Sequence, residues 1–236
     1  MILLLACSQE PDLVTLSGVV AGSREDDDVG ASEILVETLG PTYEAVDDAA
    51  TDGRGYFEVQ VIGSTLMYVT FSGDDFAATG FTGVVGAEDY AVDDGILFMK
   101  TDDEVAALDA QYAGCPYVEE EGVGLVEGEV RYHLPGYEVD DGEWPLAGNA
   151  YAWLTDEGGT TWDACYLDGE TGLYDPDAEV TGDTGRIAIF GAFSGPATLT
   201  VGYEIEGEPY YATEYMVHVP EGGIAPIYPA YVPLPG

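Results

Sequence analysis

The sequence predicts an all-β protein built from two tandem Greek-key β-sandwiches of immunoglobulin-like type, with one short helix in the linker. Tyr, Thr and Val are abundant, and 32 Gly and 13 Pro residues supply turn positions. Hydrophobic residues make up 46% of the chain, which is enough for a packed core. The third observation is that one series of strand and turn patterns occurs twice in the 236 residues.

The internal repeat divides most of the chain into residues 13–99, named repeat one, and residues 124–236, named repeat two. Each repeat begins with a strand that contains a Gly, TLSGVVAG or LVEGEVRY, and each then passes through an acidic loop to an alternating strand. A matched turn and strand follow, TDGRGYFEVQV and TGDTGRIAIFG, in which Thr51 corresponds to Thr181 and Gly55 to Gly185. Each repeat ends with a Gly before an apolar strand.

The turn in each repeat has a clear physical basis, because Gly accepts positive φ and Asp bonds to nearby backbone amides. The period-2 pattern after the turn predicts a shared inner face for Phe57, Val59 and Val61. In repeat two, the same pattern places Ile187 and Ile189 on one face and Ala188 and Phe190 on the other.

The repeated motifs resemble the carboxypeptidase regulatory-like family, also described as prealbumin-like or transthyretin-like domains. The matching residues of repeat one are Gly18, Val19, Val20, Gly30, Ala31, Thr51, Asp52, Gly55 and Phe57. Those of repeat two are Gly128, Val130, Pro145, Leu146, Ala147, Gly148, Thr181, Asp183 and Gly185, with Ile187 where the family has Phe and an insertion at 156–180. The resemblance implies a seven-strand sandwich for each repeat and a non-catalytic role as a spacer or binding unit.

The segment 100–123 between the repeats reads as an acidic linker that contains a short helix. Thr101 and Glu104 have the spacing of a capping box, which predicts a helix from about Asp102 to Gln111. Cys115 follows in the linker, and Cys165 lies in the insertion of repeat two. In an oxidising compartment these two residues are expected to form a disulfide, with two unrelated free thiols as the alternative.

Residues 1–12 are expected to lie outside both sandwiches. Leu4, Leu5, Ala6 and Cys7 resemble a bacterial lipoprotein signal, although no basic residue precedes them. The resemblance implies that Cys7 is acylated, for example by palmitate, and that the following residues form a tether. Ser8 after the cysteine is consistent with sorting to the outer membrane or cell surface. The alternative is a buried cysteine on an N-terminal strand.

Charge is the strongest compositional signal, with 46 acidic residues against 5 basic residues and a net charge of -41. Such a surface repels nucleic-acid phosphates and anionic lipid head groups, and it attracts cations and basic proteins. It also repels itself unless salt or divalent ions screen it. The simpler interpretation is that the charge provides solubility.

The sequence predicts no enzyme. His133 and His218 both fall in predicted strands, opposite the apolar face, and are expected to lie on a strand surface. The motifs of serine hydrolases, zinc proteases and phosphate-binding loops do not occur. Carboxylate pairs that could serve a hydrolase are unavoidable among so many acidic residues, so they say little.

Clustered carboxylates favour Ca²⁺ as the one expected metal. The candidate clusters are Glu25 to Asp28, the pair Asp140 and Asp141, and the densest stretch, Asp175, Asp177, Glu179 and Asp183. The alternative is that these segments are solvated loops.

Aromatic residues gather in repeat two, where Trp153 and Tyr151 lie close in sequence to other rings. A glycan-binding face is predicted for Trp144, Trp162 and Tyr166. The alternative is that Trp153 and its neighbours fill the core of the sandwich. The sequence therefore predicts a lipid-anchored surface protein with a structural or adhesive role toward a protein or glycan, and as the alternative a carbohydrate-binding or enzyme-accessory module.

Overall fold

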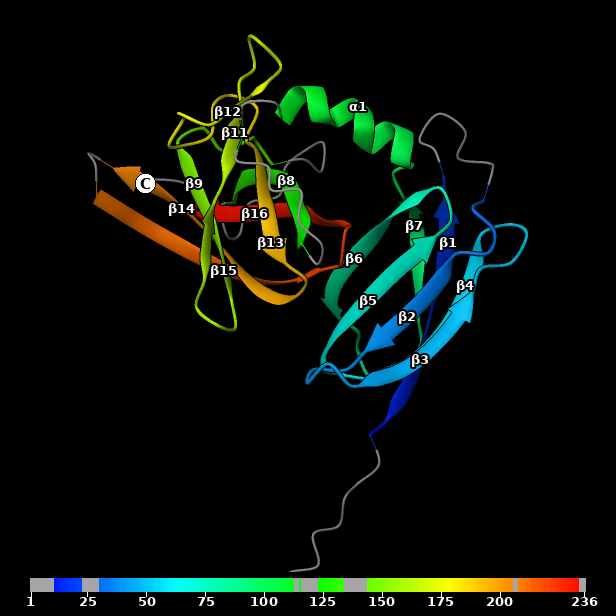
Figure 1. Ribbon diagram of the computed structural model, residues 1–236. Coiled ribbons are helices and arrows are strands. Elements are labelled where there is room, and N and C mark those ends of the chain that lie inside the picture. Colours follow the sequence, from blue (N-terminus) through cyan, green and yellow to red (C-terminus); the bar gives the residue numbers. More distant parts are fainter. Residues whose placement is uncertain are drawn as a thin grey trace, which may run out of the picture.

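The computed structural model (Figure 1) describes residues 11–22, 30–112, 115, 123–133, 144–205 and 208–233. The predicted all-β class with one short helix is confirmed. Strands β1 to β7 are Leu13–Ala21, Leu35–Leu39, Ala45–Ala50, Tyr56–Ile62, Leu66–Gly73, Phe76–Val84 and Tyr90–Phe98, followed by helix α1, Asp102–Tyr112. Strands β8 to β16 are Val123–His133, Ala150–Asp156, Thr161–Asp163, Cys165–Leu167, Tyr174–Asp175, Arg186–Phe193, Gly195–Ile205, Glu208–Val219 and Ile224–Pro233.

Strand pairing is the same in the two repeats. In repeat one, β1 lies between β4 and β7, and the opposite sheet has the order β3-β2-β5-β6. In repeat two, β8 lies between β13 and β16, and the opposite sheet has the order β10-β9-β14-β15. The last strand of each repeat runs parallel to the first, and the other pairs are antiparallel. Repeat one thus has seven strands, whereas repeat two has seven equivalent strands and adds β11 and β12.

A buried threonine network occupies the same place in both repeats. The Thr51 hydroxyl accepts a bond from the Ile34 amide at 3.0 Å and donates to the Ala31 carbonyl at 2.6 Å. In repeat two, the Thr181 hydroxyl accepts from the Ala150 amide at 2.9 Å and donates to the Ala147 carbonyl at 2.5 Å. In repeat one the network links the loop before β2 to the turn before β4, and in repeat two it links the loop before β9 to the turn before β13.

The turn glycines of the two repeats are also equivalent. Gly55 has a φ of 76° and Gly185 a φ of 59°. A Cβ on Gly55 would lie 2.2 Å from the Val20 carbonyl oxygen, and one on Gly185 would lie 2.6 Å from that of Val130. Both positions therefore require Gly for conformation and for space.

Each repeat encloses a core between its two sheets. Phe57, Val59 and Val61 are each 1% exposed and pack in the core of repeat one, as their alternation predicts. Ile187 and Ile189 pack in the corresponding core of repeat two. The opposite face of β13 is buried as well, because Ala188 and Phe190 belong to a third cluster with Tyr112 and both bonded cysteines.

Helix α1 closely matches the predicted range and begins with the predicted capping box. The Thr101 amide donates to the Glu104 carboxylate at 2.8 Å, and the Glu104 amide donates to the Thr101 hydroxyl at 3.2 Å. The helix contacts β6 of repeat one and β12 of repeat two, so it lies across the place where the repeats meet (Figure 1). At its end, the Tyr112 hydroxyl donates to Glu127 at 3.0 Å, and Lys100 forms an ion pair with the same carboxylate.

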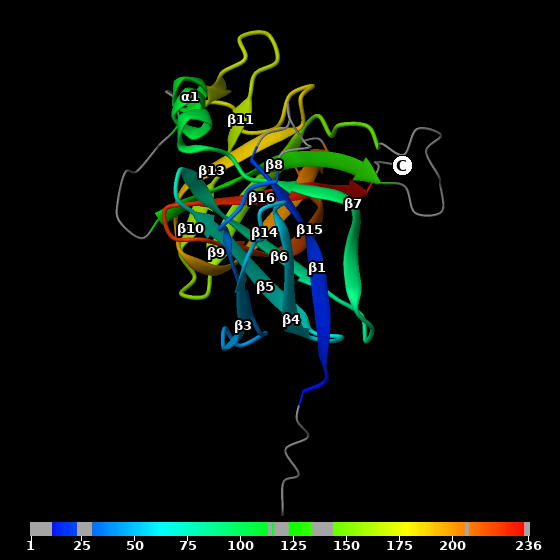
Figure 2. The same cartoon turned by 90° about the vertical axis from the view of Figure 1, so that its right-hand side faces the viewer.

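The two repeats share one continuous sheet. Strand β16 pairs with β6 at Ile224 and Thr79, which joins the β3-β2-β5-β6 sheet to the strands around β8 in a nine-stranded sheet (Figure 2). Two glycines allow the close approach: a Cβ on Gly80 would lie 2.5 Å from the His218 carbonyl oxygen, and one on Gly223 would lie 2.2 Å from that of Ala78. The backbones of the two repeats are therefore in direct contact.

His218 lies in this junction, so the prediction that it lies on a strand surface is wrong. The residue is 7% exposed. Its Nδ1 bonds to the Tyr43 hydroxyl, and its Nε2 lies 2.8 Å from the Thr70 hydroxyl, so both partners come from repeat one. Burial lowers the pKa of His218 to about 4. One neutral tautomer satisfies both bonds, with Tyr43 donating to Nδ1 and Nε2–H donating to Thr70. The apolar alternation of β15 could not reveal this, because repeat one covers the outer face.

Candidate functional site

The strongest candidate site in the described part of the chain is a cleft of about 660 Å³ at one edge of repeat two. It forms where the chain leaves β10, passes Ala164 and enters β11 in the other sheet. Its size falls in the range of small-molecule sites. The lining residues are Tyr151, Ala152, Trp153, Asp163, Ala164, Tyr166, Pro176, Asp177, Ala178 and Glu179.

Two parallel aromatic rings form one wall of the cleft. Along β9, Ala152 and Leu154 point into the core, so Tyr151 and Trp153 lie on the opposite face and are half-buried. Their ring centroids are 5.3 Å apart with an interplanar angle of 9°. Asp163 of β10 is the direct cross-strand partner of Trp153 and therefore lies beside it.

Tyr166 forms the floor of the cleft and is 4% exposed. Strand β10 pairs with the second half of β9. In the first half of β9, the Ala152 amide instead donates a hydrogen bond to the Tyr166 hydroxyl at 2.9 Å. Burial raises the pKa of Tyr166 to about 12, so this hydroxyl stays protonated at neutral pH. The residue is a structural support and not a titrating group.

The segment after β12 forms the second wall, and two contacts fix its position. The Asp177 amide donates to the Asp175 carboxylate at 2.9 Å, and Ala178 packs on the core of repeat two. Asp177 and Glu179 line the cleft from this side and face a rim that also contains Asp163. Among the described residues, three carboxylates and no Lys or Arg therefore line the cleft.

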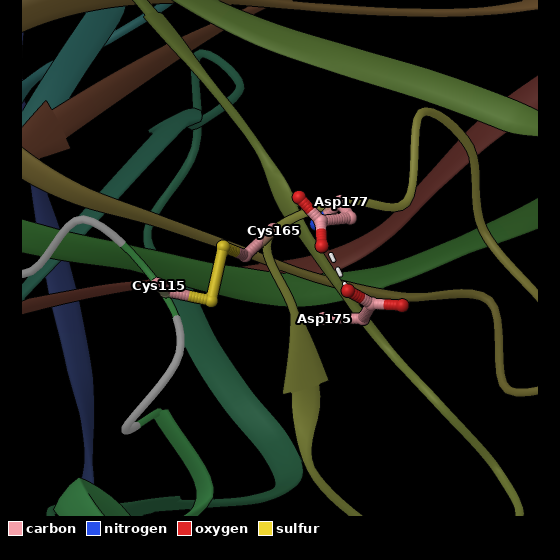
Figure 3. Close-up of a disulfide and its surroundings, with 4 residues drawn as sticks. All are labelled: Cys115, Cys165, Asp175 and Asp177. Atoms are coloured by element: carbon pink, nitrogen blue, oxygen red, sulfur yellow. Dashed lines mark hydrogen bonds between the residues drawn. A yellow bond between two sulfur atoms is a disulfide. The ribbon is translucent and has the colours of Figure 1, made fainter.

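A disulfide anchors the strand that carries the floor (Figure 3). Cys115 and Cys165 are joined in the structure, with Cα atoms 6.2 Å apart and a sequence separation of 50. Cys165 packs in the cluster under helix α1, whereas its neighbour Tyr166 points the other way into the core of repeat two. The bond thus ties the linker to β11 directly beside the cleft.

The residues predicted for glycan binding do not form one surface. Trp144 packs against His133 with ring centroids 4.8 Å apart, and Trp162 packs against Phe193 at 5.5 Å. Of the three predicted residues, Tyr166 alone lines the cleft. Sequence reasoning missed Tyr151 and Trp153 as a pair, although their alternation with Ala152 and Leu154 was a usable signal. The alternative that Trp153 and its neighbours fill the core is wrong for Trp153, which lies on the outer face, but it is right for Tyr166 in the core and Trp162 packed against it.

The predicted calcium ligands are only partly brought together. Asp175 and Asp177 share a local turn (Figure 3), but no group of three His, Cys, Asp or Glu side chains among the described residues is close enough to hold a metal ion. The calcium site is therefore still only a prediction for its four proposed ligands, Asp175, Asp177, Glu179 and Asp183. Cys7, the cluster Glu25 to Asp28 and the pair Asp140 and Asp141 lie outside the described residues.

The described residues contain no helix with the length and apolar character needed to cross a membrane. Comparisons with protein families and with curated proteins find no match.

Among solved structures, the chain is similar to the Bacillus anthracis TIE protein, with 11% identity and a TM-score of 0.32 over 94% of this chain. The chain spans about a third of that protein, because the match covers 34% of its length. A minor pilin of Streptococcus agalactiae matches with 14% identity and a TM-score of 0.31, over 94% of this chain and 98% of the pilin. The shaft pilin SpaA from Lactobacillus rhamnosus GG matches with 8% identity and a TM-score of 0.25, over 92% and 96%. TM-scores this low do not establish a common fold.

Proposed function

We propose that this chain is a non-catalytic protein of a bacterial cell surface, in which two β-sandwiches act as one rigid unit with a structural or adhesive role. The observation that carries the proposal is the junction, where one sheet continues from repeat one into repeat two. Domains joined by a linker usually move relative to each other unless their interface is extensive. In this chain, backbone pairing, a buried histidine and close glycine contacts oppose movement of one repeat relative to the other.

Several independent contacts support rigidity. Gly80 and Gly223 bring the backbones together from opposite sides of the junction. His218 bonds to Tyr43 and Thr70 across it. Lys100 and Tyr112, which flank the linker helix, both reach Glu127 of repeat two. A rigid unit of this kind can hold a binding surface at a fixed place relative to its anchor.

A distance measurement tests the proposal. Spin labels at Glu58 of repeat one and Asp183 of repeat two, both exposed, are expected to give one narrow distance distribution. Gly80→Ala is expected to broaden or shift that distribution, because its Cβ would meet the His218 carbonyl oxygen. Gly83→Ala on the same strand is the matched control, since its Cβ would meet only a Met67 methyl group at 3.7 Å. A broad distribution in the unaltered protein would contradict the proposal.

The anchor is a separate part of the proposal and is supported by the sequence alone. We propose that Cys7 carries the lipid, that residues 8–12 form a short tether before β1, and that the protein lies at the outer membrane or cell surface. Cells that express the full gene with its native upstream region are expected to attach an alkyne-labelled palmitate to the protein. Cys7→Ser is expected to abolish the label, and an equal label on that variant would refute the anchor.

A further inference from the structure

The cleft of repeat two combines two recognition chemistries in one place. Tyr151 and Trp153 are stacked on each other along β9, so a sugar ring would pack its C–H face against an outer face of this pair. Aromatic faces also attract cations, because the centre of the ring carries a negative quadrupole. The two rings are therefore suited to a ligand with flat apolar faces and a positive charge.

The carboxylates around the rings select the sign of that charge. Asp163 lies beside Trp153, and Asp177 and Glu179 also line the cleft. The lining contributed by the described part of the chain contains no basic residue, and the chain as a whole has a net charge of -41. A carboxylate can accept bonds from hydroxyl or ammonium groups, and the bond to an ammonium group is the stronger. Acidic ligands would be repelled both locally and by the whole molecule.

The cleft is also formed in advance, which lowers the ordering cost of binding. The Tyr166 hydroxyl fixes the floor to β9 through Ala152. The Cys115–Cys165 disulfide holds the strand of the floor, and the Asp175–Asp177 turn and the packing of Ala178 hold the far wall. Each wall is thus held by contacts that do not involve the groups offered to a ligand.

We propose that this cleft binds an oligosaccharide whose pyranose rings carry protonated amino groups. A sugar ring would stack on an outer face of the Tyr151–Trp153 pair, and the ammonium groups would pair with Asp163, Asp177 and Glu179. Neutral glycans of the same shape would bind more weakly, and acidic glycans would not bind. The inference does not depend on the rigidity of the junction, so either proposal can fail without the other.

Isothermal titration calorimetry of the full chain with three tetrasaccharides tests the order of affinity. The tetramer of glucosamine is expected to bind about tenfold or more tightly than the tetramer of N-acetylglucosamine, because a charge-assisted bond is lost on acetylation. The tetramer of galacturonic acid is expected not to bind. Added NaCl is expected to weaken the glucosamine complex and to leave the neutral complex nearly unchanged.

Matched variants locate the site. Trp153→Ala is expected to weaken glucosamine binding about tenfold, whereas Trp144→Ala, at a half-buried Trp outside the cleft, is expected to have no effect. Asp163→Asn and Glu179→Gln preserve side-chain shape and are expected to weaken the charged ligand more than the neutral one. Asp183→Asn, exposed and outside the lining, is the control. Thermal melting of each variant separates loss of binding from loss of folding.

Three results would overturn the inference. The first is no binding of the glucosamine tetramer at millimolar concentration. The second is equally tight binding of a hexalysine peptide, which would show attraction of cations without recognition of sugar rings. The third is an equal loss of affinity in a folded Trp153→Ala and in Trp144→Ala, which would place the binding elsewhere.

Discussion

Repeat one and repeat two have the same strand pairing and the same threonine network, yet they use equivalent surfaces differently. The Thr51 hydroxyl accepts from the Ile34 amide, as the Thr181 hydroxyl accepts from the Ala150 amide, so Ile34 and Ala150 are equivalent positions of the two repeats. Three residues further along each strand, Glu37 is therefore equivalent to Trp153. On the outer face, Glu37 pairs with Thr70, as Trp153 pairs with Thr200. In repeat one this face contacts His218 of the other repeat, whereas in repeat two it borders the aromatic cleft.

The comparison separates what the sandwich requires from what has been added to it. The network and the turn glycines occur in both repeats, so they belong to the shared fold. Strands β11 and β12, the ring pair and the attachment point of the disulfide at Cys165 occur in repeat two, and all of them border or support the cleft. Leu35 and Glu37 stand in repeat one at the positions of Tyr151 and Trp153, so that surface has no equivalent ring pair. The additions therefore lie in the part of the chain that holds the proposed binding cleft.

Removing the disulfide is expected to give the largest difference between the repeats. A bond that closes a loop of 50 residues stabilises by about 4 kcal/mol in the chain-entropy description. The double variant Cys115→Ser and Cys165→Ser is expected to lose about this free energy of unfolding in urea. Hydrogen exchange is expected to rise around β11 and to stay unchanged in β1 and β4. A uniform rise across both repeats would show that the bond stabilises the whole chain equally.

The junction is expected to weaken as pH falls. The pKa of His218 is about 4 in the folded protein against an ordinary value of 6.5, so the unfolded state binds more protons between these values. The contribution of His218 to stability is present above pH 6.5 and is lost as pH falls toward 4, by about 3 kcal/mol in total. Tyr43 and Tyr68 face the imidazole, and burial is the main cause that raises the pKa of both tyrosines, with a smaller rise from the nearby Glu157 carboxylate.

His218→Gln removes the titrating group and supplies the control. Urea unfolding of this variant between about pH 7 and pH 4.5 is expected to show a smaller loss of stability than the unaltered protein. The difference between the two curves isolates His218 from the carboxylates that titrate at lower pH. Parallel curves for the two proteins would show that the imidazole is not held neutral in the junction.

The shared threonine network gives a test of equivalence. Thr51→Val and Thr181→Val each leave a buried amide and a buried carbonyl without the hydroxyl, which is expected to cost about 2 kcal/mol in either repeat. Thr82→Val is the matched control, because the Thr82 hydroxyl oxygen is buried without a hydrogen-bond partner among the described residues. Its replacement is expected to be neutral or stabilising. A large loss at one threonine alone would contradict the equivalence of the repeats.

Features that depend on neighbours in sequence could be predicted, whereas features that depend on contact between the repeats could not. The Thr51 and Thr181 motifs, the capping box of Thr101 and the face of Phe57 all follow from short-range patterns. The burial of His218 follows from the docking of one sandwich on another, and the cleft follows from a strand that changes sheets at Ala164. The predicted insertion at 156–180 wrongly included β10, which is the equivalent of β3. A strand of three residues is too short to show a clear alternation in the sequence.

The smallest expected effect concerns Ca²⁺ and the acidic stretch that distinguishes repeat two. A net charge of -41 is expected to make both repeats more stable as NaCl screens their self-repulsion. A weak site with a Kd of about 1 mM would add about 1 kcal/mol at about 5 mM Ca²⁺, beyond NaCl of equal ionic strength. Asp183→Asn, at a position outside the cleft lining and outside the turn that holds its wall, is expected to remove that extra stabilisation and to leave glycan binding unchanged. Melting temperatures that depend on ionic strength alone would refute the calcium site and would leave only general screening, which acts on both repeats.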